Sequence, residues 1–384
     1  MKILIITKKI TTLGGVQRTS CVLANALNHD VVLLSDDRVC DKSKYEVSDK
    51  VKRVDLNDVC PKFFKNSFLR RLLKKLNRNI SFLNNKFLLN LNKRINYKSR
   101  NVKLLSNYIN KNNFDFVIAS QGELSMYLAF CNIESKKIGW MHSMFDNYYF
   151  KKNTYYYGQS LLFKKYLNDL DEIVVLSRYD KNKYKKNWNI DVNAITNIKS
   201  FESIEKSTLT NKTFLAAGRF NYEKGFDILI NAFYKFHKKN KEYKLIILGD
   251  GELEEEYNAL IIKYKLQNFI TIKKNVSNIQ PYLLNCCGFI MPSRWEGLGL
   301  VMVEAFETGV PVIAFDLPTI RDYLISYYNG IKCARMNANC LCNAMNSYVE
   351  LNRIELQKNC IETSKKFDEG VIIEKWNEIF KKYY

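Results

Sequence analysis

The chain alternates short apolar runs with segments whose apolar residues recur every three or four positions. Apolar runs at 3–7 and 31–35 flank a helical pattern at 16–27, an order that predicts a strand, a helix and a second parallel strand. Further strands are predicted at 114–120, 136–142 and 172–177. The first part of the chain should therefore form a parallel sheet covered by helices.

The second half repeats this plan. Strands are predicted at 213–218, 243–249, 268–272, 288–293 and 311–315, and helices near 225–240, 252–265, 278–285 and 300–308. The charged stretch 199–212 shows no buried periodicity and is expected to be the seam between two doubly wound α/β domains. A last helix near 371–382 could belong to either domain.

The segment 59–114 differs from both halves, because it contains fourteen Lys or Arg residues and no Asp or Glu. Four leucines lie on one face of a predicted helix, and basic residues occupy the rest of its surface. The leucines are Leu69, Leu72, Leu73 and Leu76, and the basic residues are Arg70, Arg71, Lys74, Lys75 and Arg78. The apolar face could pack on its own domain, or the helix could dock on anionic lipid. We favour the membrane, because an ordinary solvated face mixes charge signs.

Composition indicates an anionic partner and the cellular compartment of the protein. The 384 residues include 60 basic and 39 acidic ones, a net charge of +21 that suits a phosphorylated substrate, a membrane surface or nucleic acid. No nucleic-acid-binding motif accompanies that charge. Ten cysteines without C-x-x-C and only three histidines argue against zinc and favour free thiols in the cytoplasm. No signal peptide or long uncharged apolar stretch is apparent.

Residues that could bind a ligand come directly after the predicted strands, at the edge where open α/β sheets bind ligands. Gly218 ends one strand, and Arg219 and Lys224 precede the next helix, so two cations beside a helix N-terminus could hold a diphosphate. The turn Gly249-Asp250-Gly251 has a structural explanation that is at least as good as a ligand contact.

The stretch "SRWEGLGLVMVEAFETGVPV" (293–312) carries two acids eight positions apart, Glu296 and Glu304. Gly297 and Gly299 free the backbone between them. An acid between apolar runs is costly to bury without a partner, and the vicinal hydroxyls of a ribose would be suitable partners for Glu304. Glu296 could accept hydrogen bonds from sugar hydroxyls.

Three segments in order, "GRFNYEKGFDILINAF", "LGDGELEEEY" and "PSRWEGLGLVMVEAFETGVPVIAFD", resemble the signatures of the retaining glycosyltransferases of family 4. The resemblance covers about 213–335 and extends more weakly to "LGGVQRTSCVLANAL", "IGWMHSMF" and "EIVVLSRYDK" in the first half. It implies the GT-B fold, in which two Rossmann-like domains face a central cleft and the C-terminal helix returns to the N-domain. The expected domains are then 1–200 with about 370–384, which binds the acceptor, and 206–368, which binds the nucleotide-sugar.

The resemblance also implies roles for single residues. Arg219 and Lys224 would hold the donor diphosphate, Glu304 the ribose, and Glu296, the first acid of the E-x7-E motif, would lie near the transferred sugar. The remaining implied contacts are the backbone of Gly218, Gly297, Leu298 and Gly299 with the donor, His142 with the sugar, and Gly14 and Gly15 between diphosphate and acceptor.

The implied reaction moves a hexose or N-acetylhexosamine from a nucleotide-sugar, with UDP as the expected nucleotide, to a polyprenyl-linked or other envelope glycan at the inner membrane face. Fixed cations would stabilise the leaving diphosphate, so neither a metal nor a cofactor is expected. The one D-x-D triplet, Asp169-Leu170-Asp171, is interpreted as a polar helix end. Two alternatives stay open: a soluble enzyme of this fold acting on a small sugar or glucan, and a nucleic-acid-binding protein.

Overall fold

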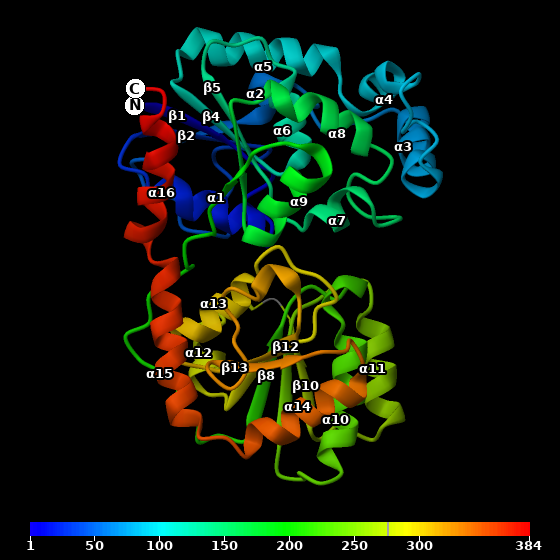
Figure 1. The fold of residues 1–384 in the computed structure, drawn as a ribbon, viewed down its shortest axis with the longest axis vertical. Helices are drawn as coiled ribbons and strands as arrows, with labels where there is room; N and C mark the ends of the chain where they lie inside the picture. The colour runs from blue at the N-terminus through cyan, green and yellow to red at the C-terminus, as the bar shows by residue number, and fades with distance from the viewer. Residues whose placement is uncertain (275) are drawn as a thin grey trace. The chain divides into compact units, whose positions relative to one another are not determined.

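The protein is described by a computed structural model that covers residues 1–274 and 276–384. The chain divides into two compact units, residues 1–198 together with 372–384, and residues 199–371 (Figure 1). Each unit is built on one parallel sheet whose strands alternate with helices. The predicted class of two Rossmann-like α/β domains is therefore confirmed.

The first unit contains a seven-stranded sheet in the order β3-β2-β1-β4-β5-β6-β7, with every pairing parallel. Its strands are β1 (Lys2–Ile6), β2 (Asp30–Ser35), β3 (Lys52–Asp55), β4 (Phe116–Ser120), β5 (Lys136–Trp140), β6 (Glu172–Val175) and β7 (Asn193–Ala194). The order reverses direction between β1 and β4, which creates a topological switch point at their carboxyl ends.

The helices of the first unit include the whole basic segment. They are α1 (Gly15–Ala26), α2 (Leu56–Val59), α3 (Phe68–Ile80), α4 (Leu89–Asn96), α5 (Ser99–Asn112), α6 (Gly122–Ala129), α7 (Phe145–Tyr149), α8 (Ser160–Tyr166), η1 (Leu167–Asp169) and α9 (Arg178–Trp188). Helix α16 (Glu369–Lys381) returns to this unit, where Trp376 and Phe380 pack against Trp140 and Phe116, with ring centroids 5.4 and 4.7 Å apart.

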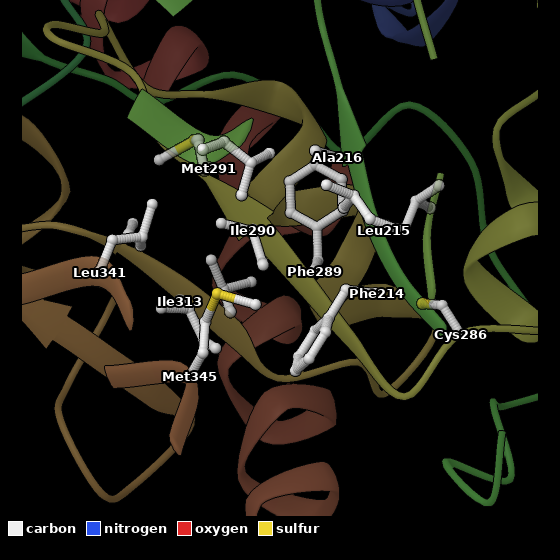
Figure 2. Packing of buried hydrophobic residues seen from close by; sticks show 14 of the residues in the cluster. Phe214, Leu215, Ala216, Cys286, Phe289, Ile290, Met291, Ile313, Leu341 and Met345 are labelled. Carbon is white, nitrogen blue, oxygen red and sulfur yellow. The ribbon is translucent and has the colours of Figure 1, made fainter. Parts of the chain in front are cut away.

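The second unit holds a parallel sheet whose described strands run in the order β10-β9-β8-β11-β12-β13. They are β8 (Thr213–Ala217), β9 (Lys244–Leu248), β10 (Ile270–Lys273), β11 (Gly288–Met291), β12 (Val312–Phe315) and β13 (Gly330–Cys333). Every residue of β11 and β12 is buried, so both faces of the sheet are covered, and this explains their continuous apolar runs. Figure 2 shows Phe214 and Leu215 of β8 packed in this core with Phe289 and Ile290 of β11.

The helices of the second unit lie between these strands and after them. They are η2 (Tyr222–Lys224), α10 (Phe226–His237), α11 (Glu254–Lys263), α12 (Gln280–Leu284), α13 (Leu300–Glu307), η3 (Pro318–Ile320), α14 (Ala338–Val349), α15 (Arg353–Ser364) and η4 (Lys365–Phe367). The strand order reverses between β8 and β11, so this unit also has a switch point.

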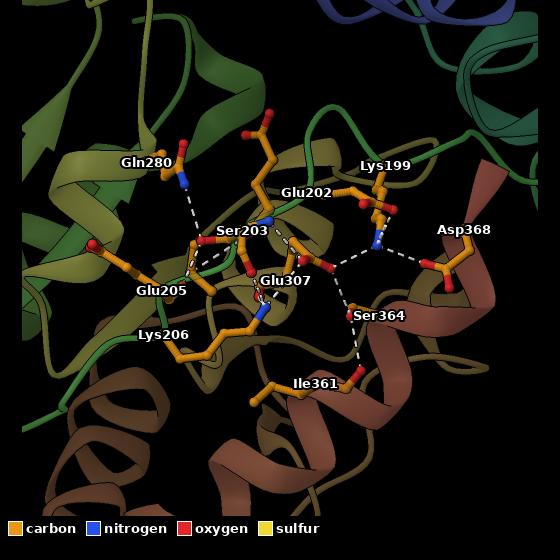
Figure 3. A network of polar contacts seen from close by, with 12 residues as sticks. Lys199, Glu202, Ser203, Glu205, Lys206, Gln280, Glu307, Ile361, Ser364 and Asp368 are labelled. Atoms are coloured by element: carbon orange, nitrogen blue, oxygen red, sulfur yellow. Dashed lines mark hydrogen bonds and ion pairs between the residues drawn. The ribbon is translucent and has the colours of Figure 1, made fainter. Parts of the chain in front are cut away.

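The charged stretch that begins at 199 is tied into the second unit by one buried acid, Glu307, at the end of α13 (Figure 3). The Glu307 carboxylate accepts from the backbone N–H of Ser203 at 3.0 Å and from the ammonium groups of Lys199 and Lys206, each at 3.1 Å. It also accepts from the Ser364 hydroxyl of α15 at 3.0 Å. A stretch without apolar periodicity is thus held in place by a tertiary charge partner.

Two further features concern the hydrophobicity of the helices and the cysteines. Within 1–274 and 276–384, no helix is long and apolar enough to cross a membrane. All ten cysteines are free thiols, and most of them are buried.

Candidate functional site

The candidate site of the second unit lies at its switch point, where β8 and β11 are neighbours. Gly218, Arg219 and η2 follow β8, and the loop 292–299 follows β11. Parallel strands end at the same edge of a sheet, so the two loops meet there. The sequence motifs around Lys224 and Glu296 are thereby brought together from 72 residues apart.

Lys224 and Glu296 form an ion pair at the centre of this edge. The Lys224 ammonium lies 2.5 Å from Glu296 Oε1, and the Ser293 hydroxyl donates to the same oxygen at 2.7 Å. The Glu296 side chain is 8% exposed and that of Lys224 is 20% exposed. The position of this cation is therefore fixed by a buried carboxylate.

The charge state of Lys224 follows from these neighbours. Burial alone would lower the pKa of Lys224, but the carboxylates of Glu296 and Glu223 outweigh burial and the net pKa is raised. The ammonium is therefore charged at neutral pH. The positive charge of Arg219 lowers the pKa of Lys224, so the two predicted cations interact electrostatically.

The loops after β8 and β11 are locked together by contacts that the sequence motifs did not reveal. The Arg294 guanidinium pairs with both carboxylate oxygens of Asp227 at 3.0 and 2.6 Å and donates to the Tyr222 carbonyl at 2.6 Å. Gly225 has φ +66°, and a Cβ there would lie 2.2 Å from the Pro292 carbonyl oxygen. Only glycine allows this approach, so Lys224 is held beside the second loop.

The turn at 249–251 has the structural role that the sequence suggested. The Asp250 carbonyl accepts from the Phe220 N–H at 2.6 Å, and a Cβ on Gly249 would lie 1.9 Å from the Gly218 carbonyl oxygen. This turn supports the loop that carries Arg219, which is exposed.

The other donor-site candidates lie on the same segment. Glu304 is buried in the middle of α13, one turn before Glu307. Gly297, Leu298 and Gly299 form the turn into α13, and the Thr319 hydroxyl fixes the Glu296 carbonyl at 2.8 Å. Contact of Glu304 with a ribose, and of the turn with a donor, stay predictions.

The predicted histidine lies at the carboxyl edge of the first unit's sheet. His142 follows β5, its ring lies 4.3 Å from that of Trp140, and its backbone N–H donates to the Tyr148 hydroxyl at 3.1 Å. Burial lowers the pKa of His142 to about 3, so the imidazole is neutral at physiological pH. Gly14 and Gly15 lie where α1 begins, and the Gly14 N–H donates to the Tyr45 hydroxyl at 2.5 Å.

Buried polar atoms without a hydrogen-bond partner gather at this edge. They include Thr7 Oγ1 after β1, Trp140 Nε1 at the end of β5 and His142 Nε2. Such atoms are costly to bury unless a ligand or water completes them.

No metal centre is found among the residues that the structure describes, since no three His, Cys, Asp or Glu side chains lie together in a suitable arrangement. Asp169 ends η1, and Asp171 accepts from the Lys137 N–H at 2.8 Å. The D-x-D triplet thus ends a helix and pairs with β5.

The apolar side of the basic helix α3 is open to solvent. Leu69, Leu72 and Leu76 of α3 face solvent, which excludes packing of the apolar face on its own domain. Phe68, Leu69 and Ile80 are 76%, 63% and 66% exposed. Asn77 is instead the buried residue of α3, and it donates to the Gly158 carbonyl at 2.8 Å.

The five basic candidates of α3 divide into two groups. Arg71, Lys75 and Arg78 are exposed beside the apolar residues. Arg70 and Lys74 are half-buried on the inner side, where Arg70 donates to the Arg94 carbonyl at 2.9 Å. Only Arg71, Lys75 and Arg78 are therefore placed to contact a membrane surface.

Sequence comparison relates the chain to sugar-transferring enzymes. Residues 198–367, which contain the Lys224–Glu296 pair, match the family model described as glycosyl transferases group 1. An uncharacterized glycosyltransferase of Haemophilus influenzae is 26% identical over 72% of this chain and 79% of its own length. The amylovoran biosynthesis glycosyltransferase AmsD of Erwinia amylovora is 29% identical over 54% of this chain and 62% of its own length.

Structure comparison bears on the fold. A crystal structure of a TarM variant from S. aureus, in complex with fondaparinux, alpha-GlcNAc-glycerol and UDP, superposes with a TM-score of 0.77. The alignment covers 99% of each chain at 16% identity. This likeness confirms the GT-B class of the fold.

Proposed function

We propose that the protein is a retaining, metal-independent glycosyltransferase of family 4. It moves a hexose or N-acetylhexosamine from a nucleotide-sugar, UDP-linked in the first instance, to a cell-envelope glycan or polyprenyl-linked acceptor. The observation that carries the proposal is the Lys224–Glu296 ion pair at the switch point of the second unit. The pair lies in the segment matched by the glycosyltransferase family model, and relatives such as AmsD support an envelope glycan.

The chemistry follows from where charge develops. When the bond between the sugar and the phosphate breaks, electrons pass to the departing diphosphate and the sugar becomes oxocarbenium-like. A cation fixed before the reaction stabilises the growing negative charge at little reorganisation cost. Lys224 has that character, because Glu296 and Ser293 hold its position and its pKa is raised. Arg219, exposed on the same loop, supplies the second cation.

This geometry refines the role of Glu296. Its Oε1 already accepts from Lys224 and Ser293, so the carboxylate is first a positioning group for the cation. The family resemblance also puts Glu296 near the sugar, so we propose that its carboxylate accepts from a sugar hydroxyl as well. Retention by front-face attack, in which the leaving phosphate takes the acceptor proton, requires no further carboxylate.

The donor is tested by hydrolysis and transfer assays across UDP-, GDP- and ADP-sugars with a chelator present. We expect turnover with one UDP-sugar, unchanged by the chelator, because lysine and arginine supply the positive charge. Loss of turnover on chelation would contradict metal independence. Turnover with ADP-sugars alone would contradict the assignment of UDP as the nucleotide of the donor.

We further propose that α3 docks the enzyme on an anionic membrane surface at the inner membrane face. Its outward side combines large apolar residues with the exposed cations Arg71, Lys75 and Arg78. An exposed apolar stripe flanked by cations is the arrangement of an interfacial helix, whose binding combines apolar burial with attraction to anionic lipid. The polar contact of Asn77 with Gly158 fixes which side faces outward.

Liposome flotation tests the docking surface. We expect the wild-type protein to float with vesicles that contain anionic lipid and to bind neutral vesicles weakly. Leu69→Asp with Leu72→Asp should abolish flotation, because charged residues cannot enter the apolar boundary. Ile354→Asp, on an equally exposed position of α15, is the matched control. Equal flotation of wild type and the double variant would contradict docking through α3, and failure of the wild type to float would favour a soluble enzyme.

A further inference from the structure

A tyrosine and an aspartate hold the short turn between β5 and α7. We call this turn, residues 141–144, the histidine turn, because it carries His142. Inside the turn, the His142 N–H donates to the Tyr148 hydroxyl at 3.1 Å. At the end of the turn, the Phe145 N–H donates to Asp180 Oδ1 at 2.8 Å. The turn is therefore fixed by side chains of α7 and α9 that belong to none of the motifs singled out in the sequence.

Asp180 departs from the usual hydrogen bonding of a helix start. Ser177 caps α9 and its hydroxyl accepts from the Asp180 N–H at 3.1 Å, as in a capping box. The acid of such a box normally reaches back to the backbone N–H of the capping residue. Here Asp180 Oδ2 accepts from the Ser177 hydroxyl at 2.6 Å, and Oδ1 accepts from Phe145, where α7 begins. Asp180 is 1% exposed, so this buried acid joins the starts of two helices.

Tyr148 supports the turn from the other side. Its side chain is buried, and its ring lies 5.1 Å from the ring of Tyr155 and 5.0 Å from that of Tyr156. A ring packed in this way cannot swing, so the hydroxyl that accepts from the His142 N–H has a fixed position. The His142 ring in turn lies 4.3 Å from the ring of Trp140. The direction of the imidazole thus depends on where Tyr148 holds the backbone.

His142 has one atom that a ligand would complete. Within residues 1–274 and 276–384, its buried Nε2 has no hydrogen-bond partner. A ring nitrogen of neutral imidazole either donates or accepts, and a sugar hydroxyl can serve as the partner in both cases.

We propose that Asp180 and Tyr148 are positioning residues for sugar transfer, which hold the histidine turn so that His142 contacts the transferred sugar. This inference rests on the proposed function and adds to it two residues that act through a third. Their effect should be large, because a misplacement of about 1 Å caused away from the reacting atoms can lower a rate by about 10²-fold.

Other contacts keep α7 in place when Asp180 is replaced. The hydroxyl groups of Tyr149 on α7 and Tyr184 on α9 lie 2.7 Å apart in a hydrogen bond. The Lys183 ammonium of α9 lies 3.1 Å from the Asp146 carboxylate of α7. Loss of the Asp180 carboxylate should therefore loosen the histidine turn without detaching α7 from α9.

Steady-state transfer assays test the two residues. We expect Asp180→Ala and Tyr148→Phe each to lower kcat about tenfold or more, while the KM for the donor stays within about twofold of wild type. Either change made in His142→Ala should cause little further loss, because both act through the imidazole. The matched control is Asp55→Ala, a buried acid that caps α2 after β3, three strands away from β5. It should keep wild-type kinetics even where it lowers stability.

A conservative variant sharpens the test. Asp180→Asn keeps an oxygen that can accept from the Phe145 N–H, so its kcat should return to within about threefold of wild type. A loss in Asp180→Asn as large as that in Asp180→Ala would overturn positioning through this hydrogen bond. Losses that add fully to that of His142→Ala, or wild-type kinetics in both Asp180→Ala and Tyr148→Phe, would overturn the inference as a whole.

Histidine ring NMR gives a readout that needs no turnover. The chain has three histidines, so the His142 signal is assigned by its absence in His142→Ala. Burial keeps the pKa of His142 at about 3, and its signals should not titrate in the ordinary histidine range in wild type or Asp55→Ala. In Asp180→Ala and Tyr148→Phe we expect shifted signals and a pKa raised toward the ordinary 6.5, because a loosened turn admits water.

The two readouts separate this inference from the proposed function. If the wild-type protein transfers sugar from no nucleotide-sugar, the proposed function fails and removes the catalytic part of the inference. Altered His142 signals in the two variants would still support the bracing of the histidine turn by Asp180 and Tyr148. Unchanged signals in both variants would overturn that bracing, whether or not sugar is transferred.

Discussion

Lys224→Ala is expected to lower kcat/KM for sugar transfer by about 10²–10³-fold, the usual effect of removing one preorganised charge donor from a transition state. The loss should appear mainly in kcat, because the diphosphate gains charge only as the sugar departs. Steady-state transfer assays with the best donor measure it. Lys239→Ala, an exposed lysine just after α10, is the matched control and should retain wild-type kinetics.

The pairing of Lys224 with Glu296 makes a sharper form of this test possible. Glu296→Gln keeps the shape and a hydrogen-bond acceptor but removes the charge that fixes the ammonium 2.5 Å away. If Glu296 acts through Lys224, the double variant should be little worse than Lys224→Ala alone. Full additivity of the two losses would show that Glu296 acts independently on the sugar. A folded Lys224→Ala protein with wild-type transfer rates would refute the site.

Glu307→Ala is expected to destabilise the second unit by about 3 kcal/mol, because it leaves the half-buried ammonium groups of Lys199 and Lys206 without their shared carboxylate. For a unit of this size the midpoint of thermal unfolding should fall by roughly 6–12 °C. Calorimetry on the purified protein measures it. Glu355→Ala, an exposed acid on α15, should change stability by no more than about 0.5 kcal/mol.

The Glu307 carboxylate also makes the stability of the protein depend on pH in a defined direction. Burial would raise the pKa of Glu307, but the Ser203 N–H, Lys199 and Lys206 together lower it below the ordinary value of 4.5. Its stabilising contribution is therefore complete above pH 4.5 and is lost as the pH falls through the folded-state pKa. The stability difference between wild type and Glu307→Gln should shrink over that acidic range. A difference that grows on acidification would contradict this account.

The basic helix shows what a periodic pattern can and cannot predict. The spacing of Leu69, Leu72 and Leu76 predicts a helix with an apolar face, and α3 is that helix. The direction in which this apolar face points depends on tertiary contacts. Asn77 and Asn92 both donate to the Gly158 carbonyl, at 2.8 and 2.9 Å, and these buried amide contacts turn the apolar side outward. Gly158 lies far along the sequence from both asparagines, so the sequence alone could not identify its carbonyl as their partner.

The acids of α13 give a second example. Motif spacing singled out Glu304, and the structure shows that Glu307, one turn later, is the acid that joins the stretch after 199 to α15. The two residues look alike in sequence, since both are acids in an apolar helix. Their difference lies in the cations that surround Glu307, which come from 101 to 108 residues away.

The sequence by itself determined the alternation of strands and helices and the loops that carry Arg219, Lys224 and Glu296, because apolar periodicity and strand ends are local properties. Only the tertiary structure decided that Lys224 is held by Glu296 and that Lys74 is half-buried while Lys75 faces solvent. Each of these depends on which charge or amide lies opposite, and that partner is set by sheet order and packing rather than by neighbouring residues.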